Sequence, residues 1–361
     1  MSRPAKIFID LAAVEANYKC AKILAPNSKT IAVVKADAYG HGAIEVAKKL
    51  APLVELFAVS CLEEAIAIRQ AGIKQSILLL EGCFSVDEIS LAAAQNCQVV
   101  VHNQQQINEL SSAKVCQPLS VWLKVDTGMH RLGVQPSDVS KAHQALKTCA
   151  NVKNTRLMSH FSSADIINSK EVVKQLEAFS TCVGTIKDDD IQLSMANSAG
   201  ILAWPNSHKN WNRPGIMLYG LSPFSECQPQ ASQLQAAMSF ESEVIAMRDV
   251  SIGESVGYGD TWVACRPSVV ATVAVGYGDG YPRNAKSGTP VFVNNQRAPL
   301  AGRVSMDMIS IDVTDLQNVN IGDKVELWGK NLGANEVAFW ADTIGYELVT
   351  RMPTRAKRLF I

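Results

Sequence analysis

The feature that most constrains the fold is a regular alternation of short apolar runs with helical segments, between residue 31 and about residue 218. The apolar runs lie at 31–34, 56–59, 77–80, 98–101, 121–125, 156–159, 192–195 and about 212–218. Segments with helical periodicity between them include 62–71, 86–94, 104–111, 137–148 and 170–186. Continuous apolar runs are typical of strands buried on both faces. Eight such strands alternating with helices predict a (βα)8 barrel of the TIM type.

A doubly wound open sheet is the structural alternative. Such a sheet usually has fewer strands, and no Gly-x-Gly-x-x-Gly follows the first apolar run of the alternation. The sequence therefore favours an α/β fold in which residues 1–230 form the barrel. A short strand at 7–9 and a helix that is capped by Asp10 and runs to about Leu24 precede the alternation.

The pattern changes after Pro223. Residues 225–235 are polar and predict a linker, and from about residue 237 short extended runs are separated by turn residues. The dipeptide Asn294-Asn295 lies between two such runs, as a hairpin turn would. Residues 231–361 are predicted to form a C-terminal mostly-β domain, with strands at 240–247, 261–264, 269–275, 290–293, 308–313 and 324–327, a helix near 334–344 and a last strand at 357–361.

Composition indicates which classes of partner the protein does not favour and in which cellular compartment it works. The 34 basic and 34 acidic residues cancel, which favours neither nucleic acid nor an anionic membrane as a partner. No apolar run approaches the roughly 18 residues of a membrane span, and residues 1–10 lack the apolar stretch of a secretory signal. Nine cysteines without a Cys-x-x-Cys pair are typical of reduced thiols. We expect a cytoplasmic protein with no nucleic-acid, membrane or metal partner.

Chemically useful residues follow several of the predicted barrel strands. Because the carboxyl ends of barrel strands meet at one rim, we expect these side chains to lie close together. A lysine amine can form a Schiff base, and hydroxyls and backbone amides can hold a phosphate group, so the set fits an aromatic aldehyde phosphate. In chain order the residues are Lys35, Tyr39, Lys124, Arg131, His160, Asn197, Ser198, Arg213, Gly215 and Ile216.

Each of these residues also has a structural interpretation. Lys35 could simply snorkel to the barrel rim, and His160 could be a hydrogen-bonded core histidine. Arg131 could be a surface charge, and Lys124 a salt-bridge partner of Asp126. Only their convergence at one face favours a site.

Residues 32–42, which read Ala-Val-Val-Lys-Ala-Asp-Ala-Tyr-Gly-His-Gly, resemble the pyridoxal-phosphate attachment motif of alanine racemases. That motif usually has asparagine where this chain has Asp37. Further blocks, at 126–133, 195–199, 213–220, 255–259, 276–280 and 305–307, are similar to family blocks in the same order. The resemblance covers both domains.

The resemblance implies an enzyme that interconverts L-alanine and D-alanine with pyridoxal 5′-phosphate, for peptidoglycan or for alanine catabolism. It implies a homodimer arranged head to tail with shared active sites. Lys35 would carry the cofactor and be one of two catalytic bases; the other would be the partner subunit's Tyr258. Arg131 and the amide of Met306 would contact the substrate carboxylate. Cofactor-binding positions would be Tyr39, Arg131, His160, Ser198, Arg213, Gly215, Ile216 and Tyr346. Supporting positions would be Asn197, Lys124, which is carbamylated in family members, and Tyr277 and Asp307 in the substrate access channel.

Three other functions compete with this interpretation. A barrel-type amino-acid decarboxylase shares the cofactor and the two-domain plan, but uses a catalytic cysteine in the β domain, whereas this chain has Tyr258. A broad-specificity racemase usually carries a secretion signal, whereas residues 1–10 of this chain lack the apolar stretch of such a signal. A non-catalytic pyridoxal-phosphate carrier ends where the β domain of this chain begins.

Overall fold

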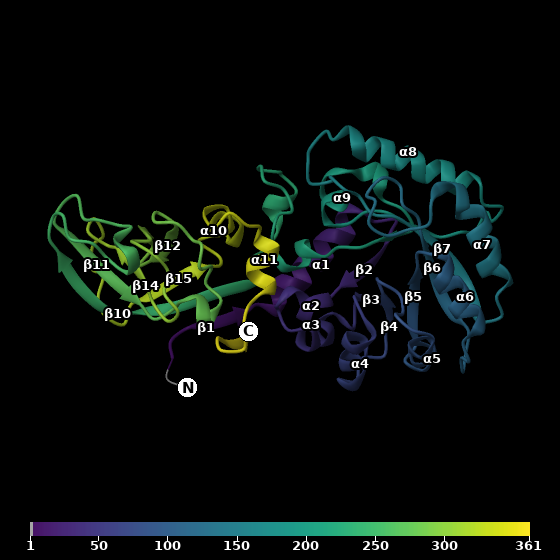
Figure 1. Ribbon diagram of the computed structural model, residues 1–361, viewed down its shortest axis with the longest axis horizontal. Coiled ribbons are helices and arrows are strands. Elements are labelled where there is room, and N and C mark those ends of the chain that lie inside the picture. Colours follow the sequence, from purple (N-terminus) through teal and green to yellow (C-terminus); the bar gives the residue numbers. More distant parts are fainter. Residues whose placement is uncertain (1–2) are drawn as a thin grey trace.

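Eight parallel strands close into a barrel in the computed structural model of the protein, which describes residues 3–361. The barrel occupies one end of an elongated molecule (Figure 1). Its strands are β2 (Lys29–Val33), β3 (Leu56–Val59), β4 (Ser76–Leu79), β5 (Cys97–Val101), β6 (Leu119–Lys124), β7 (Val152–Met158), β8 (Leu193–Ser194) and β9 (Trp211–Asn212). The helices around it are α1 (Leu11–Leu24), α3 (Ala43–Leu50), α4 (Leu62–Gln70), α5 (Val86–Ala94), α6 (Gln104–Ser112), α7 (Val139–Thr148), α8 (Lys170–Gly184) and α9 (Ser198–Ala203). The predicted barrel is confirmed.

The continuous apolar runs are explained by two packed faces on each strand. Ile31, Leu56 and Trp122 belong to the cluster that fills the barrel interior. Their neighbours Ala32 and Phe57 belong to the larger cluster that contains the buried faces of the surrounding helices. Both sets are almost completely buried, so neither face of these strands needs polar residues.

The predicted last barrel strand, at about 212–218, is wrong in its extent. Strand β9 ends at Asn212, and Ile216–Tyr219 form a 3-10 helix, η3. Pro214 lacks the N–H that a strand ladder requires. The amides of Gly215 and Met217 donate to the Ser198 hydroxyl at 2.9 and 3.3 Å instead. The chain therefore leaves the barrel wall at the rim.

A mixed sheet forms the other end of the molecule (Figure 1). Its strands are β1 (Lys6–Ile9), β10 (Met238–Val250), β11 (Ser268–Val273), β12 (Pro290–Val293), β13 (Gln296–Pro299), β14 (Ile309–Asp312), β15 (Lys324–Trp328) and β16 (Lys357–Phe360). Strand β1 pairs antiparallel with β10 and parallel with β16, so residues 6–9 belong to this sheet although they precede the barrel. We propose that the boundary between the barrel domain and the sheet domain lies near residue 230.

Most local predictions for this half hold. Asn294 and Asn295 join β12 to β13 with φ of 47° and 60°, as a two-residue type I′ hairpin turn requires. A local prediction for the barrel half also holds: the Asp10 carboxylate accepts a hydrogen bond from the Ala13 amide at 3.0 Å and so caps α1, as expected.

Two local predictions for this half are wrong. The strand expected at 261–264 is only an isolated bridge between Ser255 and Val263, because Val263 is exposed and adds nothing to the core. The helix expected at 334–344 ends at Trp340 as α10 (Ala334–Trp340), because Asp342 has a φ of 50°.

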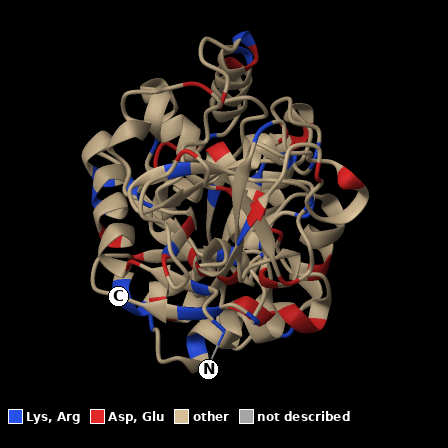
Figure 2. Cartoon of the chain, turned by 90° about the vertical axis from the view of Figure 1, so that its left-hand side faces the viewer, with Lys and Arg blue, Asp and Glu red and all other residues tan. Residues whose placement is uncertain are grey.

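Helix α11 (Gly345–Thr350) lies where the barrel and the sheet domain meet (Figure 1). None of the helices within residues 3–361 combines the length and the apolar character needed to cross a membrane. Lysine and arginine residues are interspersed with aspartate and glutamate along the chain (Figure 2), so neither sign dominates.

Candidate active site

A cavity of about 560 Å³ lies at the barrel rim where the strands end. It brings together every barrel position that the sequence singled out, and α11 adds one residue from the other half of the chain. The predicted positions that line it are Lys35, Tyr39, Lys124, Arg131, His160, Asn197, Ser198, Arg213, Gly215, Ile216 and Tyr346.

Lys35 reaches the cavity from a left-handed turn, which the sequence did not predict. The turn follows β2, and Ala36 to Tyr39 all have φ between 51° and 54°. This conformation costs roughly 1–2 kcal/mol for each non-glycine residue, so the surroundings must hold it. The Glu64 carboxylate accepts from the Ala36 amide at 2.6 Å. The turn directs both Lys35 and Tyr39 into the cavity.

Asp37, where the family motif usually has asparagine, helps to hold this turn. Its Oδ1 accepts a hydrogen bond from the Ala43 amide at 2.8 Å, at the start of α3. Its Oδ2 lies 3.2 Å from Nη1 of Arg358, in β16. The extra negative charge is therefore paired with an arginine and points away from the cavity lining.

Arg213 is a buried cation whose hydrogen-bond partners are all neutral. Its Nη1 donates to the Ser194 hydroxyl at 2.6 Å, and its Nη2 donates to the Ser159 carbonyl at 2.7 Å and to Nδ1 of His160 at 3.2 Å. Burial lowers the pKa of Arg213 to about 10, so the guanidinium stays charged near neutral pH. Among the hydrogen bonds of residues 3–361, none uses its Nε.

His160 is neutral in this environment. Burial, and then the nearby charges of Arg213, Lys124, Arg131 and Lys35, hold its pKa well below the usual value of 6.5. Because Nδ1 accepts from Arg213, the ring proton is on Nε2.

Lys124 lies at the end of β6 and points into the barrel. Burial lowers its pKa to about 8, and the cationic neighbours Arg213, Arg131 and Lys35 add to this effect. Asp126 is not its partner: the ion pairs within residues 3–361 do not join the two. The Asp126 carboxylate instead accepts from the Gly128, Met129 and His130 amides and so fixes the turn that leads to Arg131.

A set of neutral donors lies at one end of the cavity. Burial raises the pKa of Tyr39 to about 12 and also raises that of Tyr346, so both phenols keep their protons. Their rings lie 6.2 Å apart. The hydrogen bonds of residues 3–361 leave the Ile216 amide unused. Gly215 makes room here, because a Cβ atom would lie 2.6 Å from the Tyr39 hydroxyl.

Sequence reasoning missed Glu81, which also lines the cavity. Its carboxylate lines the cavity together with the cationic side chains of Lys35, Lys124, Arg131 and Arg213. The sequence could have revealed it, since Glu81 follows β4 at the same rim.

Four predicted positions do not reach the cavity of their own chain: Tyr258, Tyr277, Met306 and Asp307 all lie on turns of the sheet domain. Tyr258, in the 3-10 turn η5 (Tyr258–Asp260), is 70% exposed, Met306 is 52% exposed and Tyr277 is 41% exposed. Tyr277 and Met306 lie on adjacent turns, since the Tyr277 amide donates to the Ser305 carbonyl at 3.0 Å.

Families of known proteins match both domains of the chain. The family "Alanine racemase, N-terminal domain" matches residues 9–223, and "Alanine racemase, C-terminal domain" matches residues 237–360. The chain belongs to the alanine racemase family. The alanine racemase of Pseudoalteromonas atlantica is 52% identical, with all of both chains covered.

Solved alanine racemases have the same fold. The biosynthetic alanine racemase of Pseudomonas aeruginosa matches with a TM-score of 0.96 at 45% identity, covering 99% of each chain. The alanine racemase of Bartonella henselae, solved with covalently bound pyridoxal phosphate, matches with a TM-score of 0.89 at 29% identity and covers 99% of each chain. The arrangement of barrel and sheet domain is therefore that of the family.

Proposed function

We propose that the protein interconverts L-alanine and D-alanine, with pyridoxal 5′-phosphate bound in the barrel cavity. The observation that carries the proposal is the convergence of Lys35, Arg213 and the two phenols in one cavity of a chain from this family. We also infer that it works in the cytoplasm, where its nine free thiols would stay reduced.

The cavity residues fit the cofactor at three points. The phenols of Tyr39 and Tyr346, the Ser198 hydroxyl and the free Ile216 amide would hold the phosphate, because all are neutral donors at neutral pH. The Lys35 amine would make the covalent link. Arg213, which has no carboxylate partner among residues 3–361, would face the ring nitrogen.

When bound, the cofactor supplies an electron sink that acidifies the α-carbon of the amino acid attached to it. Arg213 would moderate this sink, because a guanidinium cannot release its proton to the ring nitrogen. His160, neutral and bound to Arg213, would hold that arginine in place. Arg131 would orient the substrate carboxylate.

Racemisation needs a proton acceptor on one face of the α-carbon and a proton donor on the other. Lys35 would serve one face. Tyr258 is exposed on the sheet domain and does not line the cavity of its own chain, so its phenol is free to serve another subunit. We infer a head-to-tail homodimer in which the partner subunit's Tyr258 serves the second face. The neighbouring Tyr277 and Asp307 would line the access channel of that shared site.

The experiment that tests the function is a direct assay of L-alanine conversion by the purified, cofactor-loaded protein. The circular dichroism signal of L-alanine should decay to zero as the racemic mixture forms. L-serine, L-lysine and L-ornithine serve as comparison substrates. Conversion of another amino acid with alanine untouched, or release of carbon dioxide, would reject the proposal.

We expect Lys124 to be carbamylated, which would give the cationic cluster a second negative group beside Glu81 and a partner for Arg131. The neutral amine attacks carbon dioxide, a nitrogen–carbon bond forms, and one proton is released to solvent. Because the pKa of Lys124 is lowered to about 8, the neutral amine is abundant above that pH and scarce below it. The modification should therefore increase as pH rises through about 8.

Carbon-13 NMR of protein equilibrated with labelled bicarbonate measures this modification. The wild-type protein should show a carbamate signal that is absent from Lys124→Ala, and the variant should lose roughly 10- to 100-fold in activity as Arg131 loses its orientation. A wild-type spectrum without the signal at pH 9 would contradict the expectation.

A further inference from the structure

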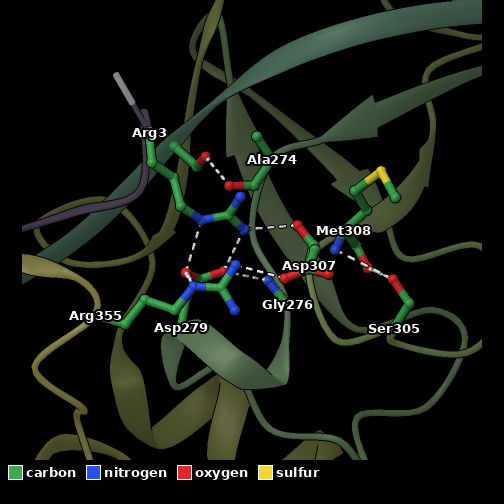
Figure 3. A network of polar contacts seen from close by, with 9 residues as sticks. Arg3, Ala274, Gly276, Asp279, Ser305, Asp307, Met308 and Arg355 are labelled. Carbon is green, nitrogen blue, oxygen red and sulfur yellow. Dashed lines mark hydrogen bonds and ion pairs between the residues drawn. The ribbon is translucent and has the colours of Figure 1, made fainter. Parts of the chain in front are cut away.

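Three segments that are distant in the sequence meet at the carboxylate of Asp279, namely residue 3, residues 276–279 and residue 355 (Figure 3). Its side chain, in the 3-10 turn η6 (Tyr277–Asp279), is 0% exposed. Arg3 binds it with two nitrogens: Nε lies 2.8 Å from Oδ1 and Nη2 lies 2.5 Å from Oδ2. Nε of Arg355 lies 3.2 Å from Oδ1. The Gly276 amide donates to Oδ2 at 3.0 Å, which closes the turn.

Both arginines continue from Asp279 to a second turn, residues 305–308. Arg3 Nη2 donates to the Asp307 carbonyl at 2.8 Å, and Arg355 Nη2 donates to the Asp307 carboxylate at 2.5 Å (Figure 3). A single guanidinium presents its donors in a fixed planar fork, so each arginine fixes the distance and the orientation between the two turns.

The two turns are also joined through their backbones. The Tyr277 amide donates to the Ser305 carbonyl at 3.0 Å, and the Gly278 amide donates to the Met306 carbonyl at 2.9 Å. Gly276 permits this approach, because a Cβ atom there would lie 2.3 Å from the Ser305 carbonyl oxygen. The carbonyls of 305 and 306 are thus occupied, while no hydrogen bond within residues 3–361 uses the Met306 amide N–H. The Asp307 amide is likewise unused among these hydrogen bonds, so the turn holds the neighbouring Met306 and Asp307 amides as free donors.

We propose that Asp279, Arg3 and Arg355 are positioning residues that orient the Met306 amide N–H toward the substrate carboxylate of the shared site. The inference rests on the proposed function and on the family resemblance, which implies that the Met306 amide contacts that carboxylate. Stability alone does not explain the network, since a buried ion pair is often no more stabilising than apolar residues of the same size. What it supplies is a fixed orientation between the η6 turn and the turn at residues 305–308.

The test is Arg355→Gln in the full-length, cofactor-loaded protein. The variant removes the Arg355 bridge between the Asp279 and Asp307 carboxylates but keeps Arg3, which joins Asp279 to the Asp307 carbonyl. We expect KM for L-alanine to rise roughly tenfold with kcat changed less than about twofold, because removing an interaction that bound substrate and transition state share equally raises KM alone. The inhibition constant of acetate, a bare carboxylate probe, should rise by a similar factor.

Two matched variants separate positioning from stability. Asp315→Asn removes the exposed ion pair with Arg266 in the same domain and should leave KM and the acetate constant unchanged. Arg355→Lys keeps the charge but lacks the fork that reaches both carboxylates, so its KM should lie between those of the wild type and Arg355→Gln. The absorbance of the bound cofactor should be the same in all of them.

An unchanged KM in Arg355→Gln would overturn the proposal, as would a lower melting temperature accompanied by a fall in kcat alone. If Arg355→Gln does not fold, Arg3→Gln tests the same turn, and an unchanged KM in that variant would also overturn the proposal. Absence of alanine racemisation by the wild-type protein is a different result: it rejects the proposed function, and this inference with it.

Discussion

Replacing Lys35 with alanine is expected to abolish racemisation, lowering kcat/KM by roughly 10⁴-fold or more. The lysine would supply two things at once, the covalent attachment of the cofactor and one of the two bases, so no single remaining residue can restore both. The left-handed turn from Ala36 to Tyr39 is strained backbone that exists to place this side chain and the Tyr39 phenol in the cavity. The absorbance band of the linked cofactor at about 420 nm should disappear together with turnover.

Lys29→Ala is the matched control, because Lys29 begins β2, the strand that leads to Lys35. Its amine is exposed and lies 2.8 Å from the Glu55 carboxylate, far along β2 from the rim. The control should keep both the band and the activity. A Lys35→Ala protein that retained a band at about 420 nm would show that another amine holds the cofactor.

The barrel could be predicted from the sequence because its strands are buried on both faces. Each run, such as 56–59, must be apolar at every position, and that signal is strong and local. The extent of the last strand was predicted wrongly, because its apolar run belongs partly to another kind of element. The apolar residues from 216 to 219 are buried in a 3-10 helix, and only Pro214 and the amides bound by Ser198 distinguish that helix from a strand.

The barrel half of the site could also be located from the sequence, since parallel strands bring their carboxyl ends to one rim. The left-handed turn could not. Alanine and tyrosine do not favour positive φ, and the conformation depends on Glu64 and Arg358, contacts that no local pattern contains. Tyr346 could be predicted only from the family resemblance, because it reaches the barrel cavity from α11, across the boundary between the barrel and the sheet domain.

Replacing Tyr258 with phenylalanine is the second substitution with a large expected effect. The phenol would exchange a proton with the face of the α-carbon opposite Lys35, and a general acid–base group of this kind contributes about 10²- to 10⁴-fold. We expect a loss of that size in kcat/KM in both directions, with the cofactor band unchanged. Because Tyr258 is 70% exposed in its own chain, its removal should not lower the melting temperature.

Mixing the two inactive variants then tests whether the sites are shared between chains. In a head-to-tail dimer of one Lys35→Ala chain and one Tyr258→Phe chain, one site carries both substitutions and the other carries neither. Random exchange of subunits should therefore restore about one quarter of the wild-type activity per site. If mixing restores no activity although mass spectrometry shows mixed dimers, Tyr258 does not act across the subunit interface.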